Sequence, residues 1–391
     1  MVTIKISLPN DLTFLSAMLH EGLLRSIKSS QAKKISSFEV ELPDTFLQEA
    51  YRSLSNEIQE IRLPFAGKND RGSLDKLCKK LGVSIERQSF GNLLIKMKEQ
   101  NSKLLITKPQ INLQLKPSHQ SILIDIEDKE KESFTFQIFK ADRYTGLSSL
   151  EERYTSSQLT NRLSFEATII SLLGLASSYI SGYNNNYYFL FLSPDEASSL
   201  ISQTDSSLID KYFRIKDEVV SAIRAYINSA ICNEVLSFEL MLNTTLQKLV
   251  LQENLNKISL VLFRVAMEGG QTYKLYEILP ITIYGNSVFN EKVEAYIRRP
   301  QEFITCVERM LDPKGVIIRA LNSISRGKPF IEANNVLSFI LYLYRFVTFG
   351  SIESLYASIR ELLNAYEKTK KESQDRSEVY LALMKHLSVL I

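Results

Sequence analysis

The sequence predicts an α+β protein, in which an N-terminal and central mixed α/antiparallel-β region is followed by a mainly helical C-terminal bundle. Three observations predict this class. Apolar and polar residues alternate at the start of the chain, and short apolar segments separated by polar turns fill residues 84–143. The C-terminal part instead shows apolar residues at helical spacing.

At 391 residues the chain is long for one compact domain, and we expect two. The first, over residues 1–205, is predicted to be an α+β domain with an antiparallel sheet. The second, over residues 206–391, is predicted to be mainly helical and to be interrupted by a β-hairpin near 257–280.

The N-terminal region is expected to begin with a strand over residues 2–8, because its apolar and polar residues alternate. Pro9 ends this strand, and Asn10 or Asp11 is suited to cap the helix that follows. The elements expected next are a helix over 12–27, a strand over 37–42, a helix over 43–58 and a short basic helix near 73–81.

The central region is predicted to form a small antiparallel sheet. Its segments NLLIKMK, KLLIT, INLQLK, SILIDIED and SFTFQIFK are short, rich in apolar and β-branched residues, and bounded by polar turns. A helix over 163–180, stopped by Gly182, then leads through the loop GYNNN into the buried strand YYFLFL.

Helical spacing dominates from Ser207 to about Asn254. The segments KISLVLFRVAM and QTYKLYEILPI then flank Gly269-Gly270, a pair of residues typical of a hairpin turn. The rest of the chain is expected to be a helical bundle, with breaks at residues such as Pro300 and Gly350.

The composition is that of an ordinary globular protein, with 45% hydrophobic and 23% charged residues. The net charge of +3 is too small to demand a nucleic-acid partner. Three widely spaced cysteines argue against a disulfide framework and a zinc site. The start of the chain lacks the pattern of a signal peptide, and no uninterrupted apolar stretch is long enough for a transmembrane helix. We therefore expect a cytoplasmic protein without a membrane partner.

The usual signatures of catalysis are missing from the sequence. Its three histidines, His20, His119 and His386, have no second histidine or cysteine at metal-ligand spacing. No G-x-S-x-G motif is found, and Gly67-Lys68 lacks the Ser or Thr of a phosphate-binding loop. We therefore expect no enzymatic activity, no cofactor and no metal site.

Basic residues gather in three places, and the pattern favours contact with nucleic-acid phosphates. Residues 313–330 contain four cations and no acid, and a second cluster falls within 96–116. In a third cluster, cations alternate with tyrosines. A solvated surface is the competing interpretation of each cluster alone. The first cluster is Lys314, Arg319, Arg326 and Lys328, the second Lys96, Lys98, Lys103, Lys108 and Lys116, and the third Lys140, Arg143, Tyr144, Arg153, Tyr154 and Arg162.

The loop Asn184, Asn185 and Asn186 is a fourth candidate contact. Asparagine amides pair with base edges in DNA grooves. They are also common turn formers, and this second interpretation is favoured.

The order of elements resembles the large subunit of archaeal type I-A (Apern subtype) CRISPR interference complexes. The similarity is carried by HEGLLRSI, FGNLLIKMK, the segment FKADRYTGLSSLEERYTSSQLTNRLSFEATIISLLGLASSYISG, YYFLFLSPDE, the late hairpin and the helical C-terminus. It covers most of the chain and is one of layout, without an invariant motif.

The resemblance implies a non-catalytic role in a guide-RNA ribonucleoprotein, beside CRISPR backbone subunits and a small subunit. Such a subunit helps recognise the motif that flanks the target, stabilises double-stranded and unwound target DNA, and recruits the helicase-nuclease. Two alternatives remain: a structural or assembly protein that binds no nucleic acid, and a nuclease or nucleotide-processing enzyme whose site is built from dispersed residues. The sequence argues most strongly against the nuclease.

Overall fold

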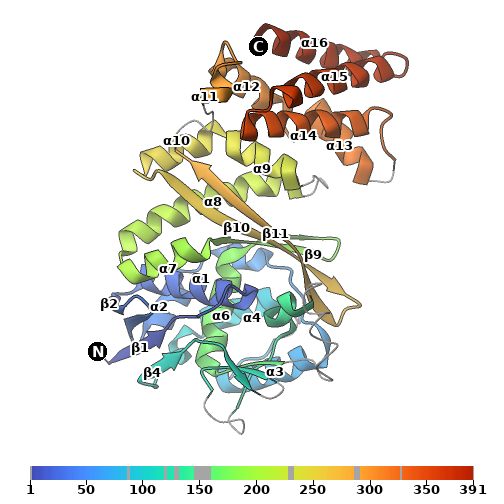
Figure 1. The fold of residues 1–391 in the computed structure, drawn as a ribbon. Helices are drawn as coiled ribbons and strands as arrows, with labels where there is room; N and C mark the ends of the chain where they lie inside the picture. Colours follow the sequence, from blue (N-terminus) through green and yellow to red (C-terminus); the bar gives the residue numbers. More distant parts are fainter. Residues whose placement is uncertain are drawn as a thin grey trace. The chain divides into compact units, whose positions relative to one another are not determined.

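The computed structural model describes residues 2–85, 89–118, 121–126, 132–144, 160–227, 233–285, 291–325 and 328–390. Its fold class is α+β, as predicted (Figure 1). The chain divides into two compact units. Unit 1 combines Met1–Arg214 with Ser259–Pro280, and unit 2 combines Ile215–Ile258 with Ile281–Ile391.

Two buried helices, α1 (Phe14–Ser29) and α6 (Phe165–Ser178), cross closely at the centre of unit 1. A Cβ atom built on Gly174 would lie 1.8 Å from the Met18 carbonyl oxygen, and one built on Gly22 would lie 2.1 Å from that of Ile170. Only glycine allows the two backbones to approach this closely. The crossing also receives a hydrogen bond of 2.8 Å from the Tyr51 hydroxyl to the Ile169 carbonyl.

The first sheet of unit 1 has the strand order β2-β3-β1-β4. β1 pairs antiparallel with β3, so that Ile4 faces Leu42, and it pairs parallel with β4. The strands are β1 (Thr3–Ser7), β2 (Lys33–Ser36), β3 (Glu39–Pro43) and β4 (Gln110–Asn112). The strand expected over 2–8 is confirmed, and the N-cap of the helix after it is Thr13, two or three residues later than the expected Asp11 or Asn10.

The second sheet has the order β11-β10-β9-β8 and contains the predicted late hairpin. Gly269 and Gly270 both have positive φ, as a two-residue type I′ turn requires. The strands are β8 (Tyr179–Tyr183), β9 (Asn186–Leu192), β10 (Lys257–Glu268) and β11 (Thr272–Tyr284). Their apolar face packs on α1, where the Phe14 ring lies 5.2 Å from that of Phe189 and 5.3 Å from that of Phe263.

The hairpin therefore corrects the expected domain organisation. It was expected to interrupt the second domain, but its residues Ser259–Pro280 belong to unit 1. The reason is strand pairing, because Leu262 and Phe263 of β10 lie opposite Leu190 and Phe189 of β9. Unit 1 also continues past the expected boundary at residue 205, to Arg214 within α8 (Ser206–Ile227).

The region 84–143 contains less sheet than predicted. The segment NLLIKMK lies in helix α4 (Phe90–Glu99), capped by Ser89, and SFTFQIFK runs into the 3₁₀ helix η3 (Gln137–Tyr144). A short apolar segment is compatible with a buried helix as well as with a strand. In NLLIKMK the N-cap Ser89 favours the helix. Among the described residues of this region the strands are short: β4 joins the first sheet, and β5 (Lys116–Ser118) and β6 (Ser121–Ile124) form a third sheet with β7 (Thr160–Leu163).

The other helical elements of unit 1 surround these sheets. Helix α2 is shorter than predicted, α3 is longer, and α6 ends at β8 before Gly182. They are α2 (Phe46–Ser53), η1 (Asn56–Glu60), α3 (Gly67–Leu81), η2 (Asn101–Lys103) and α7 (Pro194–Gln203).

Unit 2 is mainly helical, as predicted for the C-terminal region. Helices α14 and α15 form an antiparallel hairpin. Gly350 is the C-cap of α14 and adopts a left-handed conformation with a φ of 68°. Helix α16 packs on α15. The helices are α9 (Asn233–Leu242), α10 (Thr244–Gln252), α11 (Glu291–Glu294), α12 (Pro300–Met310), α13 (Val316–Ser325), α14 (Ala333–Phe349), α15 (Ile352–Thr369) and α16 (Gln374–Leu390). None of the helices in the described ranges has the length and apolar content that crossing a membrane requires.

Candidate nucleic-acid interface

The basic segment 313–330 surrounds α13 in unit 2. Lys314 lies in the turn before α13, where its backbone N–H donates to Asp312 Oδ1 at 2.7 Å. The side chains of Lys314, Arg319 and Lys328 are exposed. Within the part of the chain that the structure describes, none of these three cations forms an ion pair. Arg326 lies outside the described residues. We call Lys314, Arg319 and Lys328 the basic set of α13.

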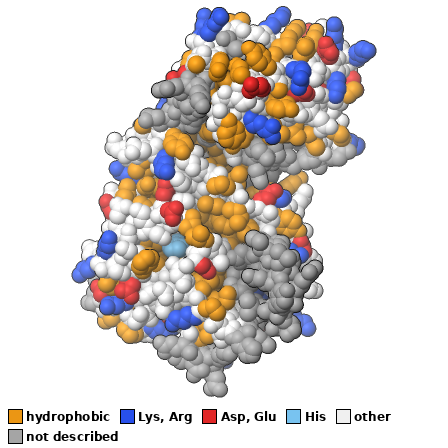
Figure 2. Space-filling model, in the orientation of Figure 1, with side chains coloured by type: hydrophobic (Ala, Val, Ile, Leu, Met, Phe, Trp, Pro, Cys, Tyr) orange, Lys and Arg blue, Asp and Glu red, His pale blue; other side chains and the backbone are white. Residues whose placement is uncertain are grey.

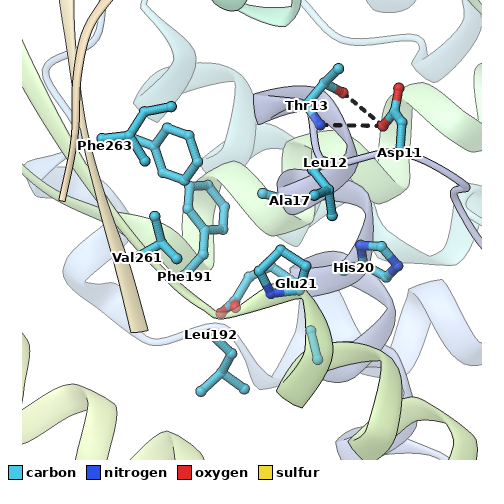
Figure 3. Close-up of a pocket in the computed structure, with 13 residues that line it drawn as sticks. Asp11, Leu12, Thr13, Ala17, His20, Glu21, Phe191, Leu192, Val261 and Phe263 are labelled. Carbon is cyan, nitrogen blue, oxygen red and sulfur yellow. Dashed lines mark hydrogen bonds between the residues drawn. The ribbon is translucent and has the colours of Figure 1, made fainter. Parts of the chain in front are cut away.

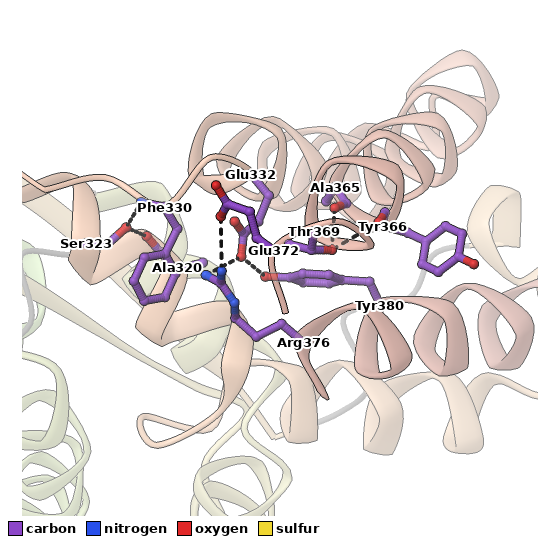
Figure 4. A network of polar contacts seen from close by, with 10 residues as sticks. All are labelled: Ala320, Ser323, Phe330, Glu332, Ala365, Tyr366, Thr369, Glu372, Arg376 and Tyr380. Carbon is purple, nitrogen blue, oxygen red and sulfur yellow. Dashed lines mark hydrogen bonds and ion pairs between the residues drawn. The ribbon is translucent and has the colours of Figure 1, made fainter. Parts of the chain in front are cut away.

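A buried polar network holds the segment that follows α13 (Figure 4). The carboxylate of Glu332, which is 0% exposed, accepts a hydrogen bond from Arg376 at 3.0 Å and one from the Tyr380 hydroxyl at 3.2 Å. The Arg376 guanidinium also lies over the Phe330 ring, 4.3 Å from its centroid. Phe330 N–H donates to Ser323 Oγ at 2.8 Å, which joins the segment after Lys328 to α13.

The network has a defined protonation state. Burial raises the pKa of Tyr380 well above its usual value, and the charge of Glu332 raises it further, against the smaller opposing effects of Arg376 and Arg319. Tyr380 therefore remains a hydrogen-bond donor at physiological pH. The hydroxyl of Tyr380 thus holds the buried Glu332 carboxylate together with Arg376.

The basic residues predicted in unit 1 do not form a comparable surface. Lys140 is only 4% exposed and lies near Asp70, so a phosphate does not reach it, and its assignment as a contact is wrong. Arg162 is half-buried on β7. Arg143 and Tyr144 belong to η3, and their side chains are not described. Arg153 and Tyr154 lie outside the described residues.

The buried carboxylate of Asp70 interacts electrostatically with Lys140. Its carboxylate accepts hydrogen bonds from the N–H groups of Ala66 and Gln137, at 2.7 and 2.6 Å. Burial raises the pKa of Asp70 to about 7, while these two hydrogen bonds and the charge of Lys140 oppose the rise. Lys140 is thus a buried residue of unit 1 whose charge acts on Asp70.

Four of the five lysines of the second predicted cluster contact partners within the chain, and Lys116 is exposed. Lys108 forms ion pairs of 3.0 Å with both Asp125 and Glu166, and Lys96 pairs with Glu99 at 2.8 Å. Lys98 and Lys103 donate to the backbone carbonyls of Leu54 and Leu81. These contacts favour the structural interpretation of this cluster.

The asparagine loop is a hairpin turn between β8 and β9. Asn184 and Asn185 have φ values of 49° and 61°, which suits the two central residues of a type I′ turn. The Asn186 amide donates to the Asn184 carbonyl at 3.1 Å. The side chains of Asn184 and Asn185 are exposed, so the turn accounts for the sequence without excluding a contact.

A basic hollow in unit 1 was missed from the sequence. It has a volume of about 380 Å³ and is lined by Arg25, Lys28, Ser29, Glu49, Arg52 and Ser53. Lys28 pairs with Asp210 at 2.6 Å and Arg25 donates to Ser177 at 2.6 Å, while Arg52 is exposed. Spacing along α1 relates Arg25 to Lys28, but Arg52 comes from α2 and only the packing of the helices brings it near.

Exposed Lys and Arg side chains are the common feature of the basic set of α13 and of the hollow at Arg52. Figure 2 shows Lys and Arg side chains on the visible face of unit 2, with hydrophobic side chains between them. Among the described residues, no three His, Cys, Asp or Glu side chains are grouped as a metal site would need. Arg and Lys in such positions contact phosphates without reading sequence.

The chain is similar over its length to an archaeal protein. An "Uncharacterized protein" of Archaeoglobus fulgidus is 36% identical over 400 residues, which cover 99% of this chain and 100% of that protein. No protein-family model matches the chain, and no solved structure matches it. At this identity over the full length of both proteins, the chain belongs to the same family as the Archaeoglobus fulgidus protein.

Proposed function

We propose that the chain is the large, non-catalytic subunit of a CRISPR RNA-guided DNA surveillance complex of the archaeal type I-A class. In this role it helps recognise the motif that flanks the target, stabilises the opened DNA and recruits the helicase-nuclease in the cytoplasm. Its partners are the backbone and small subunits, the guide RNA and the target DNA. The observation that carries the DNA-binding part is the exposed basic set of α13, for which the described residues provide no ion-pair partner.

The basic set suits contacts to a DNA backbone. Guide RNA reads most of the target by base pairing in such complexes, so the protein needs contacts that follow the backbone. Arg319 on α13 and Lys314 in the preceding turn both supply exposed positive charge. The Glu332–Arg376 pair holds the segment between Lys328 and α14 in place before DNA binds. Less conformational entropy is then lost when this segment contacts DNA. An archaeal relative is compatible with the proposed class.

An assembly protein is the second candidate, and one observation in unit 2 favours it. An open groove of about 650 Å³ lies between α12 and α16, lined by apolar residues such as Val379, Leu383 and Cys306. Val379 and Tyr356 are also exposed on this helical unit. Helical grooves of this kind receive helices of other proteins.

Purification from native cells separates the two candidates. The tagged protein is recovered at low salt, and its bound RNA and proteins are identified by sequencing and mass spectrometry. We expect short guide-like RNAs with a constant repeat-derived end, together with a repeated backbone subunit. Recovery of the protein alone, or of a homo-oligomer free of RNA, contradicts the CRISPR proposal and favours the assembly protein.

A further inference from the structure

The carboxylates that line an apolar cavity of unit 1 are hydrogen-bonded within the chain (Figure 3). Asp11 accepts from the Thr13 N–H at 3.3 Å, and Glu21 accepts from the Ser177 hydroxyl. His20, in the wall of the same cavity, is buried. The open groove of about 650 Å³ between α12 and α16 in unit 2 is different, because charged side chains that line it are exposed.

Helix α16 is apolar on two of its sides. Tyr380 and Leu387 are buried in unit 2. Val379 and Leu383 lie on another side and line the groove, where Val379 is 36% exposed. A surface helix normally has one apolar side, and a helix with a second one is suited to burial against a further element. The groove therefore has the apolar surface that a protein interface requires.

Side chains of opposite charge lie at the two ends of this groove. The N–H of Arg298 donates to the carbonyl of Leu390 at 2.8 Å, which places the start of α12 beside the end of α16. Glu302, in the first turn of α12, therefore lines the groove near the end of α16. Arg309, about two helical turns later, lines it toward the start of α16.

Both charges are available to a partner. Arg309 is exposed, and the described residues provide no ion pair for its side chain. Glu302 pairs with Arg299 at 3.3 Å, and the two side chains are 51% and 60% exposed. An exposed pair of this kind adds little to stability, so Glu302 changes partner at small cost.

We infer that this groove is the interface of a symmetric dimer, in which the same groove of a second copy of this chain packs on Val379 and Leu383. A two-fold axis through the middle of the groove exchanges its two ends. Glu302 of each chain then lies beside Arg309 of the other, and the apolar side chains are buried between the two charge pairs. A second copy is favoured over an unrelated helix because the charges of the groove are complementary to themselves.

The inference goes beyond the DNA-binding proposal and uses none of the basic set of α13. Neither outcome of the experiments below bears on whether the chain binds DNA.

Sedimentation equilibrium of the full-length protein, from low to high micromolar concentration, measures the dimer. Arg309→Glu places like charges beside each other and should raise the dissociation constant of the dimer roughly 10- to 100-fold. The double variant Glu302→Arg, Arg309→Glu restores opposite charges and should return the constant to within about threefold of the wild type. Arg360→Glu is the matched control, because Arg360 is an exposed arginine of α15, and it should leave the constant unchanged.

A cross-link tests the position of the two-fold axis. Ala382 lies midway between Val379 and His386 along the groove, so the axis brings the two copies of this residue together. Ala382→Cys should therefore form a disulfide-linked dimer under mild oxidation with copper phenanthroline. Val389→Cys, exposed near the end of α16, should not, and the wild type controls for the natural cysteines.

Far-UV circular dichroism establishes that each variant is folded, and if Arg309→Glu is not, the cross-linking comparison decides. A monomer at every concentration overturns the inference and leaves the groove to a helix of another protein. A dimer that Arg309→Glu does not weaken, or that the double variant does not restore, forms through another surface and also overturns it.

Discussion

The two units use their positive charges differently. In unit 1, lysines that look exposed in the sequence are directed to partners inside the unit, such as Lys108 between Asp125 and Glu166 and Lys140 beside Asp70. In unit 2, Lys314, Arg319 and Lys328 remain exposed without ion pairs among the described residues. Clusters of similar appearance in sequence thus have opposite roles, because a partner far along the chain decides whether a cation is available to a ligand.

The two units also differ in the contacts that hold their helices together. Unit 1 holds its central helices together by a close glycine crossing, whereas unit 2 has a buried carboxylate, Glu332, paired with Arg376. A buried ion pair adds little net stability but is costly to break on one side. Unit 2 should therefore be the more sensitive to loss of one charge.

Arg376→Ala should have the largest effect on stability. It leaves Glu332 buried with only the Tyr380 hydrogen bond, and we expect a loss of roughly 3–5 kcal/mol in the free energy of unfolding. Urea denaturation of the full chain measures it. Arg360→Ala is the matched control, because that side chain is 68% exposed and its pair with Glu361 is 3.9 Å long, so less than about 0.5 kcal/mol is expected. A cost below about 1 kcal/mol for Arg376→Ala would show that Glu332 does not depend on it.

Lowering the pH should reduce the free energy of unfolding through the buried His20 of unit 1. The pKa of His20 is about 4 in the folded protein and 6.5 ordinarily, so between these values the unfolded chain binds the proton and the folded chain does not. Stability from this residue is therefore lost as pH falls from about 6.5 to about 4, by roughly 3 kcal/mol in total.

The effect of His20 is isolated by the difference between the wild type and His20→Gln across that pH range. This comparison is needed because Asp70, whose pKa is raised to about 7, acts in the opposite direction over much of the same window. Parallel stability curves for the two proteins would refute the assignment to His20.

Charge reversal in the basic set of α13 tests the DNA contact. The triple variant Lys314→Glu, Arg319→Glu, Lys328→Glu should weaken binding of the assembled complex to target DNA roughly 10- to 100-fold and reduce the salt dependence by about 2–3 ions. Filter binding or mobility shift at several salt concentrations measures both. Lys370→Glu, Lys371→Glu, Lys385→Glu has the same change in net charge at exposed sites of the same unit. Equal losses in the two variants would mean that only the net charge matters.

The smallest effect is expected at the β8–β9 turn. Asn185→Gly keeps a residue that adopts positive φ and removes the amide, so stability should change by less than about 0.5 kcal/mol. If the loop is only a turn, preference among target-flanking motifs is also unchanged, as measured on a library of DNA targets. An altered preference at unchanged stability would assign base reading to the amide of Asn185.

The sequence predicted the fold class, the N-terminal strand, the late hairpin and the C-terminal helices, because each is encoded locally by periodicity, caps or turn residues. It misassigned NLLIKMK, since a short apolar segment has no decisive period, and the cap at Ser89 was not recognised. It also assigned the hairpin to the wrong unit, because strand pairing between β9 and β10 joins residues far apart in the chain.

The candidate binding residues were likewise determined partly by the sequence and partly by the tertiary structure. The sequence alone determined that residues 313–330 carry four cations and no acid. Only the tertiary structure decided that Lys140 is buried, that Lys108 is held between two carboxylates, and that Arg52 joins Arg25 and Lys28. The cavity at His20 likewise combines α1 with β9 and β10. The physical reason is that charge and hydrogen-bonding capacity belong to single residues, whereas burial and pairing depend on distant neighbours.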